Sequence, residues 1–525
     1  MKKYYLIFFH IIFLVFQDKH SDADIFISQR NGRDGASCGT IFLPCLSLQY
    51  ALAYRVKPKE HIRLDGGEKK PYVYVVNKPI HITNEIFISS YQNDYIRPII
   101  LMVNKKTYLF ESRGEKGIKI DVRNIDFRNI SLLILNNACN VKIVNCSFRD
   151  APTAVLFRKI PKQSNWLETV TIYILNSNFF NSTATEICCI RNIEVVLENC
   201  VFQGDKRYTL NIERISQHGV VNVTNCYIDA QRGPNLHFGR KCISSVNVLN
   251  TSFINNYFDA ALCGLCLDLC LNLVIEKSTF LGHKPAVDIS RVKNAEITHC
   301  NFTKNHRGAI RSSSSTFVAN KCNFSYNTGL AGGAIFSSNS VAKINHSIFY
   351  HNSALYSGGT VHAVSSGSFP PTFLFVQNSE MYATPTYGFT AGIIIRSDIE
   401  LYLTNVLLSI LKSSIELPLL EILNLERSDT YFRQKWVSNA NMSCPRNYKV
   451  VLPSQYPYIS ARCRRCPKGM YSIAKDTLQI LKTIGKKPFI VVKKSNFSCI
   501  ACPSIPISIY FSSMSALPKR NVQHS

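Results

Sequence analysis

The sequence predicts an all-β protein: a right-handed parallel β-helix solenoid of about 10–12 coils, followed by a small disulfide-rich tail. A short pattern of alternating apolar residues recurs through the middle of the chain, fades near residue 410, and gives way to a segment rich in cysteine and positive charge. We therefore expect a signal peptide over 1–21, an N-terminal cap over 22–60, the solenoid over 61–425 and a basic cysteine-rich tail over 431–525.

Each repeat has two apolar residues that alternate with others, then a polar residue that is often Asn, then Cys, Ser or Thr, any residue, and Phe or Ile. One instance is Val141-x-Ile143-x-Asn145-Cys146-x-Phe148, and the last position recurs at residues 148, 179, 202, 228, 253, 280, 302, 324 and 349. Alternation with a period of two predicts strands with one buried face. The phase shifts at Asn, which tolerates left-handed backbone, so the chain should turn a corner there.

Parallel stacking would place equivalent positions about 4.8 Å apart on successive coils. The phenylalanines should then form an internal aromatic stack. The corner asparagines should form an internal ladder made of Asn145, Asn176, Asn199, Asn225 and Asn250. Equivalent cysteines on neighbouring coils form two pairs, Cys200 with Cys226 and Cys300 with Cys322. Either pair could form a disulfide, but buried thiols are favoured because Ser and Thr fill this slot in other coils.

The N-terminus predicts secretion. Met1-Lys2-Lys3 precedes an apolar run from Tyr4 to Phe16, which is typical of a signal peptide and short for a membrane span. An uncleaved anchor is the alternative. An extracellular chain should carry glycan at some of its Asn-x-Ser/Thr motifs. The candidates are Asn129, Asn181, Asn222, Asn441 and Asn496.

The 19 cysteines suggest disulfides in an oxidising compartment. In the cap, Cys38 and Cys45 should close a small loop before a short amphipathic helix that starts near Ser47. The tail candidates are Cys444, Cys463, Cys466, Cys499 and Cys502. The two Cys-x-x-Cys motifs in the tail could bind zinc, but they lie further apart than in a compact zinc site, so disulfides are favoured.

The chain has a net charge of +26, of which residues 431–525 supply +15 (16 Lys and Arg less Asp476). Such a basic segment could hold acidic glycans electrostatically; the alternative is that it only aids solubility. The expected patch consists of Arg462, Arg464, Arg465, Lys468, Lys486, Lys487, Lys493 and Lys494. The expected partners are extracellular proteins or acidic glycans. Secretion disfavours nucleic acid, and membrane contact is expected only peripherally or through an uncleaved anchor.

Several motifs resemble known families. The coil pattern over roughly 60–410 resembles the pectate-lyase-like right-handed β-helix superfamily. Phe324-Ser-Tyr-Asn327 and its counterparts on neighbouring coils resemble the Phe-x-x-Asn repeats of chlamydial polymorphic membrane proteins, and Gly332-Gly333-Ala334-Ile335 resembles their Gly-Gly-Ala-Ile partners. Cys463-x-x-Cys466-Pro-x-Gly-x-Tyr-Ser is similar to an ephrin-receptor-like cysteine-rich repeat. These resemblances imply adhesion or surface display.

No catalytic residue, metal or cofactor is expected. A β-helix hydrolase needs carboxylates gathered on neighbouring coils, yet five acidic residues in the central coils fall at different places in their repeats: Asp259, Asp268, Glu276, Asp288 and Glu296. His283 is expected to be a surface histidine on a turn rather than a general base. Cys263, Cys266 and Cys270 have a spacing that could bind metal, but local disulfides or buried thiols are favoured.

The function predicted from these observations is that of a non-catalytic secreted or cell-surface glycoprotein with an adhesive, structural or glycan-binding role. The alternative is a polysaccharide lyase or glycoside hydrolase of the pectate-lyase-like β-helix class.

Overall fold

The fold is taken from a computed structural model. It describes residues 24–57, 59–82, 85–91, 96–102, 108–112, 118–135, 139–157, 170–204, 209–230, 235–239, 243–255, 263–365, 372–383, 392–396, 399–410, 418–423, 436–444, 448–451, 454–455, 458–468, 470–471, 476–481, 491–492 and 500–501. The expected signal peptide lies outside these residues, as do Asp259, Lys486, Lys487, Lys493, Lys494, Asn496, Cys499 and Cys502.

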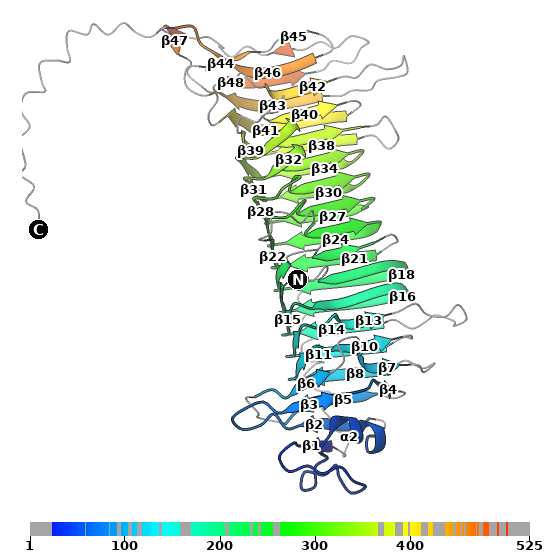
Figure 1. The fold of residues 1–525 in the computed structure, drawn as a ribbon. Coiled ribbons are helices and arrows are strands. Elements are labelled where there is room, and N and C mark those ends of the chain that lie inside the picture. The colour runs from blue at the N-terminus through cyan, green and yellow to red at the C-terminus, as the bar shows by residue number, and fades with distance from the viewer. Residues whose placement is uncertain are drawn as a thin grey trace, which may run out of the picture.

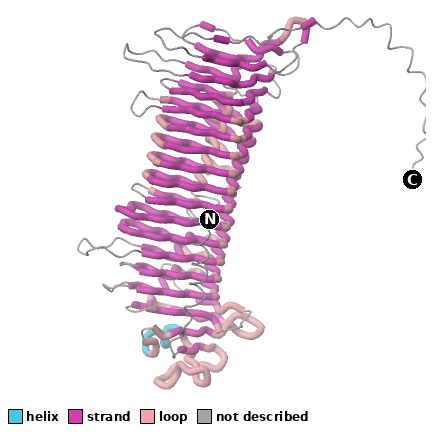
Figure 2. The backbone as a smooth tube through the Cα atoms, turned by 180° about the vertical axis from the view of Figure 1, so that it is seen from behind, coloured by secondary structure: helices cyan, strands magenta, loops and turns pink. Residues whose placement is uncertain are grey.

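The chain winds into a long right-handed parallel β-helix (Figure 1), so the predicted fold class is confirmed. Successive coils stack along the long axis, and their strands run across it (Figure 2). A typical coil adds one short strand to each of three parallel sheets. Among the described residues, the one α-helix is α2 (Leu48–Tyr54), at the N-terminal end.

The first sheet holds the strands that precede the Asn corners. It consists of β1 (Asp24–Ile27), β2 (His61–Leu64), β5 (Ile86–Ser90), β8 (Ile118–Arg123), β11 (Cys139–Val144), β14 (Val170–Leu175), β16 (Thr183–Glu198), β18 (Leu210–Thr224), β21 (Ile243–Leu249), β24 (Cys270–Glu276), β27 (Asn294–Thr298), β30 (Thr316–Asn320), β34 (Val341–Asn345), β38 (Thr372–Gln377), β41 (Ile399–Ile410) and β43 (Trp436–Ser443). Residues alternate between core and surface along these strands, as predicted.

The second sheet follows the corners and carries the phenylalanines. It consists of β3 (Val73–Val76), β6 (Ile99–Met102), β9 (Asp126–Arg128), β12 (Ser147–Arg149), β15 (Asn178–Phe180), β17 (Val201–Gly204), β19 (Tyr227–Ala230), β22 (Ser252–Ile254), β25 (Thr279–Leu281), β28 (Asn301–Thr303), β31 (Asn323–Ser325), β35 (Ile348–Tyr350), β39 (Glu380–Ala383) and the ends of β41 and β43.

The third sheet completes each coil. It consists of β4 (Ile80–Ile82), β7 (Tyr108–Ser112), β10 (Ser131–Leu135), β13 (Thr153–Phe157), the starts of β16 and β18, β20 (Leu236–Phe238), β23 (Leu265–Asp268), β26 (Val287–Ser290), β29 (Ile310–Ser313), β33 (Ile335–Ser338), β37 (Val361–Val364), β40 (Ile393–Arg396) and β42 (Pro418–Leu423). Between the second and third sheets, β32 (Thr328–Ala331) pairs with β36 (Ser353–Ser357) as a separate small sheet.

The expected aromatic stack forms inside the coils. Phe148 and Phe179 lie nearly parallel with ring centroids 5.0 Å apart, and Phe302 and Phe324 do the same at 4.9 Å. The stack runs from Phe127 to Phe202 and from Phe253 to Phe349. Ile228 occupies the same position between these two runs.

The corner asparagines adopt the predicted left-handed backbone, but their ladder is not internal. Asn199 has φ +53° and donates from Nδ2 to Oδ1 of Asn176 at 3.0 Å, on the exposed surface. Asn250 donates to Asn225 in the same way at 2.9 Å. The phase shift explains the error, because two successive residues face outward at each corner and the inward position falls to the Cys, Ser or Thr that follows.

A buried asparagine ladder exists elsewhere, at the bend after the second sheet. Asn305 donates from Nδ2 to Oδ1 of Asn327, and Asn327 donates to Oδ1 of Asn352, both at 2.9 Å. Asn327 also bonds the carbonyl oxygen of Phe302 and accepts from the backbone N–H of Asn305. These three residues are 0% exposed, so the ladder satisfies backbone groups that the bend would otherwise leave unpaired.

The two equivalent cysteine pairs remain reduced and buried. The neighbouring thiol of the pair and desolvation raise the pKa of Cys200 and of Cys300. Each of these two thiols also donates to a backbone carbonyl, that of Ile174 for Cys200 and that of Ile275 for Cys300. Cys146, in the same column, has its pKa raised to about 12 by burial. The preference for buried thiols over disulfides at these positions agrees with the structure.

The two ends of the solenoid are covered. At the N-terminal end, Ser47 caps α2 by accepting the backbone N–H of Tyr50. The first parallel strand, β1, already lies within the expected cap region, and the last, β43, within the expected tail. The tail contributes β44 (Tyr448–Val451), β45 (Ser454–Gln455), β46 (Tyr458–Arg465), β47 (Met470–Tyr471), β48 (Asp476–Leu481), β49 (Val491–Val492) and β50 (Ile500–Ala501). Antiparallel pairing of β46 with β42 and of β48 with β43 ends the parallel stack.

Candidate functional site

A patch of exposed apolar and aromatic side chains lies where three coils leave the second sheet. We define the tyrosine patch as Tyr326, Leu330, Ile348, Tyr350, His351, Leu355, Tyr356 and Tyr382. Tyr326 is 49% exposed and Tyr356 is 59% exposed. Contiguous apolar surface of this kind marks interaction sites in soluble proteins.

The repeat itself builds the patch. Tyr326 and His351 occupy the bend position one residue before the buried asparagines, with φ of +56° and +54°. Their rings stack at 5.1 Å with an interplanar angle of 12°, and the Tyr350 ring meets that of His351 edge-on at 4.2 Å. Positive φ is uncommon for residues with large side chains. The asparagine ladder beneath holds the bend, so these rings are presented on a rigid base.

Cations adjoin the tyrosine patch on the preceding coil. Lys304 holds the same bend position as Tyr326, one coil earlier, and its backbone N–H bonds the carbonyl of Ser325. Arg307 lies three residues further on, and both side chains are exposed. No Asp or Glu occurs anywhere in residues 297–379, which contain five Lys and Arg. The carboxylate of Glu380 lies at the opposite edge, where it accepts a hydrogen bond from the Tyr382 hydroxyl at 2.8 Å. The side of the patch at Lys304 and Arg307 is therefore the part suited to a ligand that combines flat apolar faces with negative charge.

The outer face of the third sheet carries a second polar cluster. Asn211, His237, Cys266, Asp288 and Arg311 occupy one column on successive strands. Nδ1 of His237 lies 2.9 Å from Oδ1 of Asn211. Desolvation raises the pKa of Asp288, and the positive charge of Arg311 opposes that rise. A partly buried carboxyl whose pKa is raised by desolvation is a candidate for proton transfer.

Asp268 lies on the same face of the neighbouring strand, displaced from Asp288 by two residues. Strand spacing and rise place the Cα atoms of the two aspartates about 8 Å apart. Asp268 is ionically paired with Arg291, with Nη2–Oδ2 at 2.5 Å. The described central acidic residues do not form one column, as expected from the sequence, but Asp268 and Asp288 share a face of the third sheet. Only the three-dimensional register shows it.

The basic patch predicted in the tail is only partly within the described residues. Arg464, Arg465 and Lys468 are exposed there, and Arg462 is half-buried on β46. β46 is joined to the solenoid end through the Cys444–Cys463 disulfide and its pairing with β42. Cys466 is disulfide-bonded as well.

Other candidate residues are placed as follows. Cys38 and Cys45 form a disulfide, and so do Cys263 and Cys266, while Cys270 is a buried thiol. Asn129 and Asn181 lie at bends after the second sheet, Asn222 accepts a hydrogen bond from Asn247 in the first sheet, and Asn441 lies in β43. Their glycosylation stays a prediction. Within the described part of the chain, no group of three or more His, Cys, Asp or Glu is placed to hold a metal ion.

His283 is not the surface histidine that was expected. It is 1% exposed and occupies the ladder position that asparagines hold on the next three coils. Its backbone N–H donates to Oδ1 of Asn305 and its ring bonds the carbonyl of Phe253, while Nε2 has no partner. Burial lowers its pKa to about 4. The neighbouring Gly and Lys suggested an exposed turn, but the inward phase of the repeat decides its position.

A family model agrees with the observed fold. Described as a right handed beta helix region, it matches residues 241–397. The tyrosine patch lies inside this match. Three residues of the polar column on the third sheet lie inside it as well: Cys266, Asp288 and Arg311. A comparison with curated proteins finds no match. No helix among the described residues is long and apolar enough to cross a membrane.

Three solved structures are similar at low identity. A rhamnogalacturonan lyase is 13% identical with a TM-score of 0.24, covering 61% of this chain and 82% of its own. The GH136 lacto-N-biosidase from Eubacterium ramulus is 10% identical with a TM-score of 0.27, covering 73% and 68%. A mannuronic acid specific polysaccharide family 6 lyase from human gut microbiota is 9% identical with a TM-score of 0.29, covering 77% and 92%.

These comparisons correct the prediction that the chain is not an enzyme, because all three similar structures are named as enzymes. TM-scores this far below 0.5 assign no reaction, substrate or residue to this chain. The prediction was based on carboxylates at equivalent repeat positions. Asp268 and Asp288 share a face of the third sheet although they are offset by two residues.

Proposed function

We propose that this chain is an extracellular or cell-surface β-helix glycoprotein that binds an acidic polysaccharide at its tyrosine patch. The observation that carries the proposal is the exposed aromatic surface on successive coils, bordered by Lys304 and Arg307 on one side, with the carboxylate of Glu380 at the opposite edge. The apparent signal peptide, the sequons and the disulfides support the compartment. The resemblance to surface-displayed repeat proteins agrees with this role.

The chemistry of such a ligand matches the patch. A pyranose ring has an apolar C–H face that can lie against Tyr326 or Tyr350, while the phenol hydroxyls stay hydrated. Uronate or sulfate groups would pair with Lys304 and Arg307. The coils repeat about every 4.8 Å, close to the rise of an extended sugar chain, so successive coils can contact successive residues of one polymer. The basic tail could add long-range attraction.

Binding to immobilised polygalacturonate, alginate and heparin tests the proposal. The double variant Tyr326→Ala/Tyr350→Ala should weaken binding about 5- to 100-fold, the loss expected from removing two aromatic contacts. Lys304→Gln/Arg307→Gln should weaken binding and reduce its dependence on salt. Tyr402→Ala removes an aromatic ring that stacks on Phe375 at the first sheet, so it is a matched control that should bind normally.

The outcomes separate the patch from the tail. If the tyrosine variant binds as tightly as the natural chain, the proposed site is wrong. If Arg464→Ala/Arg465→Ala alone abolishes binding, the tail holds the ligand.

A polysaccharide lyase or hydrolase is the second candidate function, favoured by Asp288. Its raised pKa suits a proton donor or acceptor, Arg311 can hold a substrate anion, and Asp268 supplies a second carboxylate on the same face of the neighbouring strand. New reducing ends or unsaturated products from the same polysaccharides would support it. Asp288→Asn should then abolish turnover and leave binding at the tyrosine patch intact; turnover unchanged by this substitution would exclude Asp288.

A further inference from the structure

The N-terminal cap projects an apolar loop into solvent. Ile41, Phe42 and Leu43 are 55%, 90% and 59% exposed, and we call these three residues the apolar finger. Loop tips are normally built from Gly, Pro, Asn, Asp and Ser. Three successive large apolar side chains at a tip are costly in water, so the finger needs a partner that buries it.

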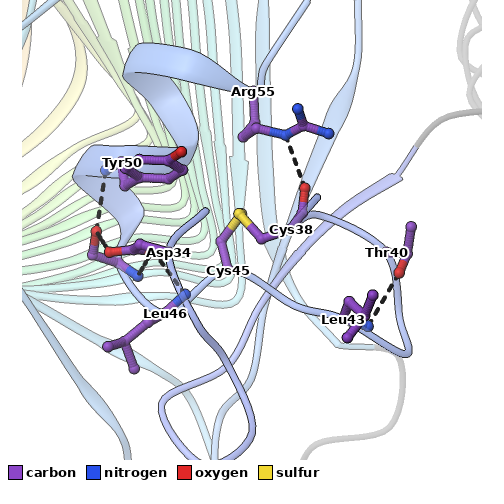
Figure 3. The surroundings of a disulfide bond; sticks show 9 residues. Asp34, Cys38, Thr40, Leu43, Cys45, Leu46, Tyr50 and Arg55 are labelled. Atoms are coloured by element: carbon purple, nitrogen blue, oxygen red, sulfur yellow. Dashed lines mark hydrogen bonds between the residues drawn. A yellow bond between two sulfur atoms is a disulfide. The ribbon is translucent and has the colours of Figure 1, made fainter. Parts of the chain in front are cut away.

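The apolar finger is held rigidly. The Cys38–Cys45 disulfide joins the two stems of the loop (Figure 3). The backbone N–H of Gly39 donates to the carbonyl of Leu43 at 2.8 Å. The Leu43 N–H donates to Oγ1 of Thr40 at 3.1 Å. Both stems also bond Phe26 of β1. The tip is thus presented in a fixed shape and pays little conformational entropy on binding.

Positive charge surrounds the stems. Arg33 is exposed, and its backbone N–H bonds the carbonyl of Pro44. The Arg55 guanidinium donates to the carbonyl of Cys38 at 2.8 Å (Figure 3). The nearby carboxylate, Asp34, is occupied by the backbone N–H groups of Leu46 and Ser47, each at 2.9 Å. From Arg30 to Glu60 the chain has five Lys and Arg against two acidic residues.

We propose that the apolar finger inserts into the interfacial layer of a membrane that carries anionic lipid. An apolar tip one side chain deep suits shallow insertion, and arginines at its base suit lipid phosphates and carboxylates. Tyr54, 74% exposed at the end of α2, and Leu46, 43% exposed, extend the amphipathic surface. A polysaccharide offers no comparable apolar layer, so this contact is independent of the tyrosine patch.

Sedimentation with vesicles tests the inference on the full chain. Vesicles of equal parts phosphatidylcholine and phosphatidylserine are compared with vesicles of phosphatidylcholine alone. Ile41→Ser/Phe42→Ser/Leu43→Ser should lower partitioning into the anionic vesicles at least about tenfold. Arg33→Gln should lower it about fivefold there and leave weak binding to neutral vesicles unchanged. Leu249→Ser/Leu271→Ser removes exposed apolar side chains of the first sheet, outside the tyrosine patch, and should bind as the natural chain does.

A fluorescence measurement gives an independent readout. Phe42→Trp should shift its emission to shorter wavelength when anionic vesicles are added, whereas Leu271→Trp, at an exposed position of the first sheet, should not. All variants keep the same apolar N-terminal run, so a difference in vesicle binding between the triple serine variant and the natural chain is due to the apolar finger. The proposal is wrong if the triple serine variant partitions into anionic vesicles as strongly as the natural chain does, or if the emission of Phe42→Trp does not shift. The apolar finger would then bind a protein pocket or have no partner.

Discussion

Replacing His283 with Asn should remove a defined part of the pH dependence of stability. His283 is buried in the ladder position and its pKa is lowered to about 4, against an ordinary value of 6.5. The unfolded chain therefore binds a proton between these two values that the folded chain does not. Stability from this group is fully present above about pH 6.5 and falls as pH drops towards 4.

The size of the effect follows from the shift. A difference of about 2.5 pKa units corresponds to about 3 kcal/mol of unfolding free energy lost between pH 6.5 and 4. Asn should fit the site, because Asn305, Asn327 and Asn352 occupy it on the next coils with a shared pattern of bonds. It would also remove Nε2, which has no hydrogen-bond partner.

Urea denaturation at a series of pH values between 4 and 7.5 measures this loss of unfolding free energy. The curves for the natural chain and for His283→Asn should diverge below pH 6.5, the variant being relatively more stable at pH 4. His61, whose pKa is also lowered to about 4, is present in both proteins and cancels in the difference. His346→Asn, which removes an exposed imidazole at a first-sheet corner, is the control. Parallel curves for the natural chain and His283→Asn would refute the assigned burial.

Three further predictions concern the core. Asn327→Leu should lower the unfolding free energy by about 3 kcal/mol, because it leaves the polar groups of its neighbours unpaired, whereas Asn199→Ala at the exposed corner should cost less than about 1 kcal/mol; equal losses would contradict the ladder assignment. Phe302→Ala should cost about 3–5 kcal/mol in the same assay, and a loss below 1 kcal/mol would disprove its stacking in the core. Mass spectrometry after iodoacetamide treatment should find six thiols unmodified in the folded protein and modified in urea, so labelling without urea would mean that the coils open. These thiols belong to Cys146, Cys200, Cys226, Cys270, Cys300 and Cys322.

The solenoid could be predicted because one short pattern repeats with a period of two and a phase shift. That pattern alone determined the inward phenylalanines and the left-handed corners. It did not give the direction of the corner side chains: the phase shift turns both Glu198 and Asn199 outward, and only the geometry of the bend shows it.

The candidate site was harder to predict because it is made from positions that do not repeat. Tyr326 and Tyr350 look like ordinary variable residues until the register brings them onto adjoining coils. Asp268 and Asp288 do not occupy equivalent positions in the repeat, so the sequence does not show that they lie on the same face of the third sheet. The absence of acidic residues over 297–379 is visible in the sequence and could have pointed to this region.

The single aliphatic residue in the aromatic stack has a consequence for how the molecule comes apart. Each coil of a solenoid touches only its neighbours, so cooperativity passes along the axis through successive contacts between coils. At Ile228 the ring-to-ring contact is missing, and with it about 0.5–1.5 kcal/mol of coupling. Under tension along the axis, the chain should therefore yield first at this junction, leaving two blocks that extend separately.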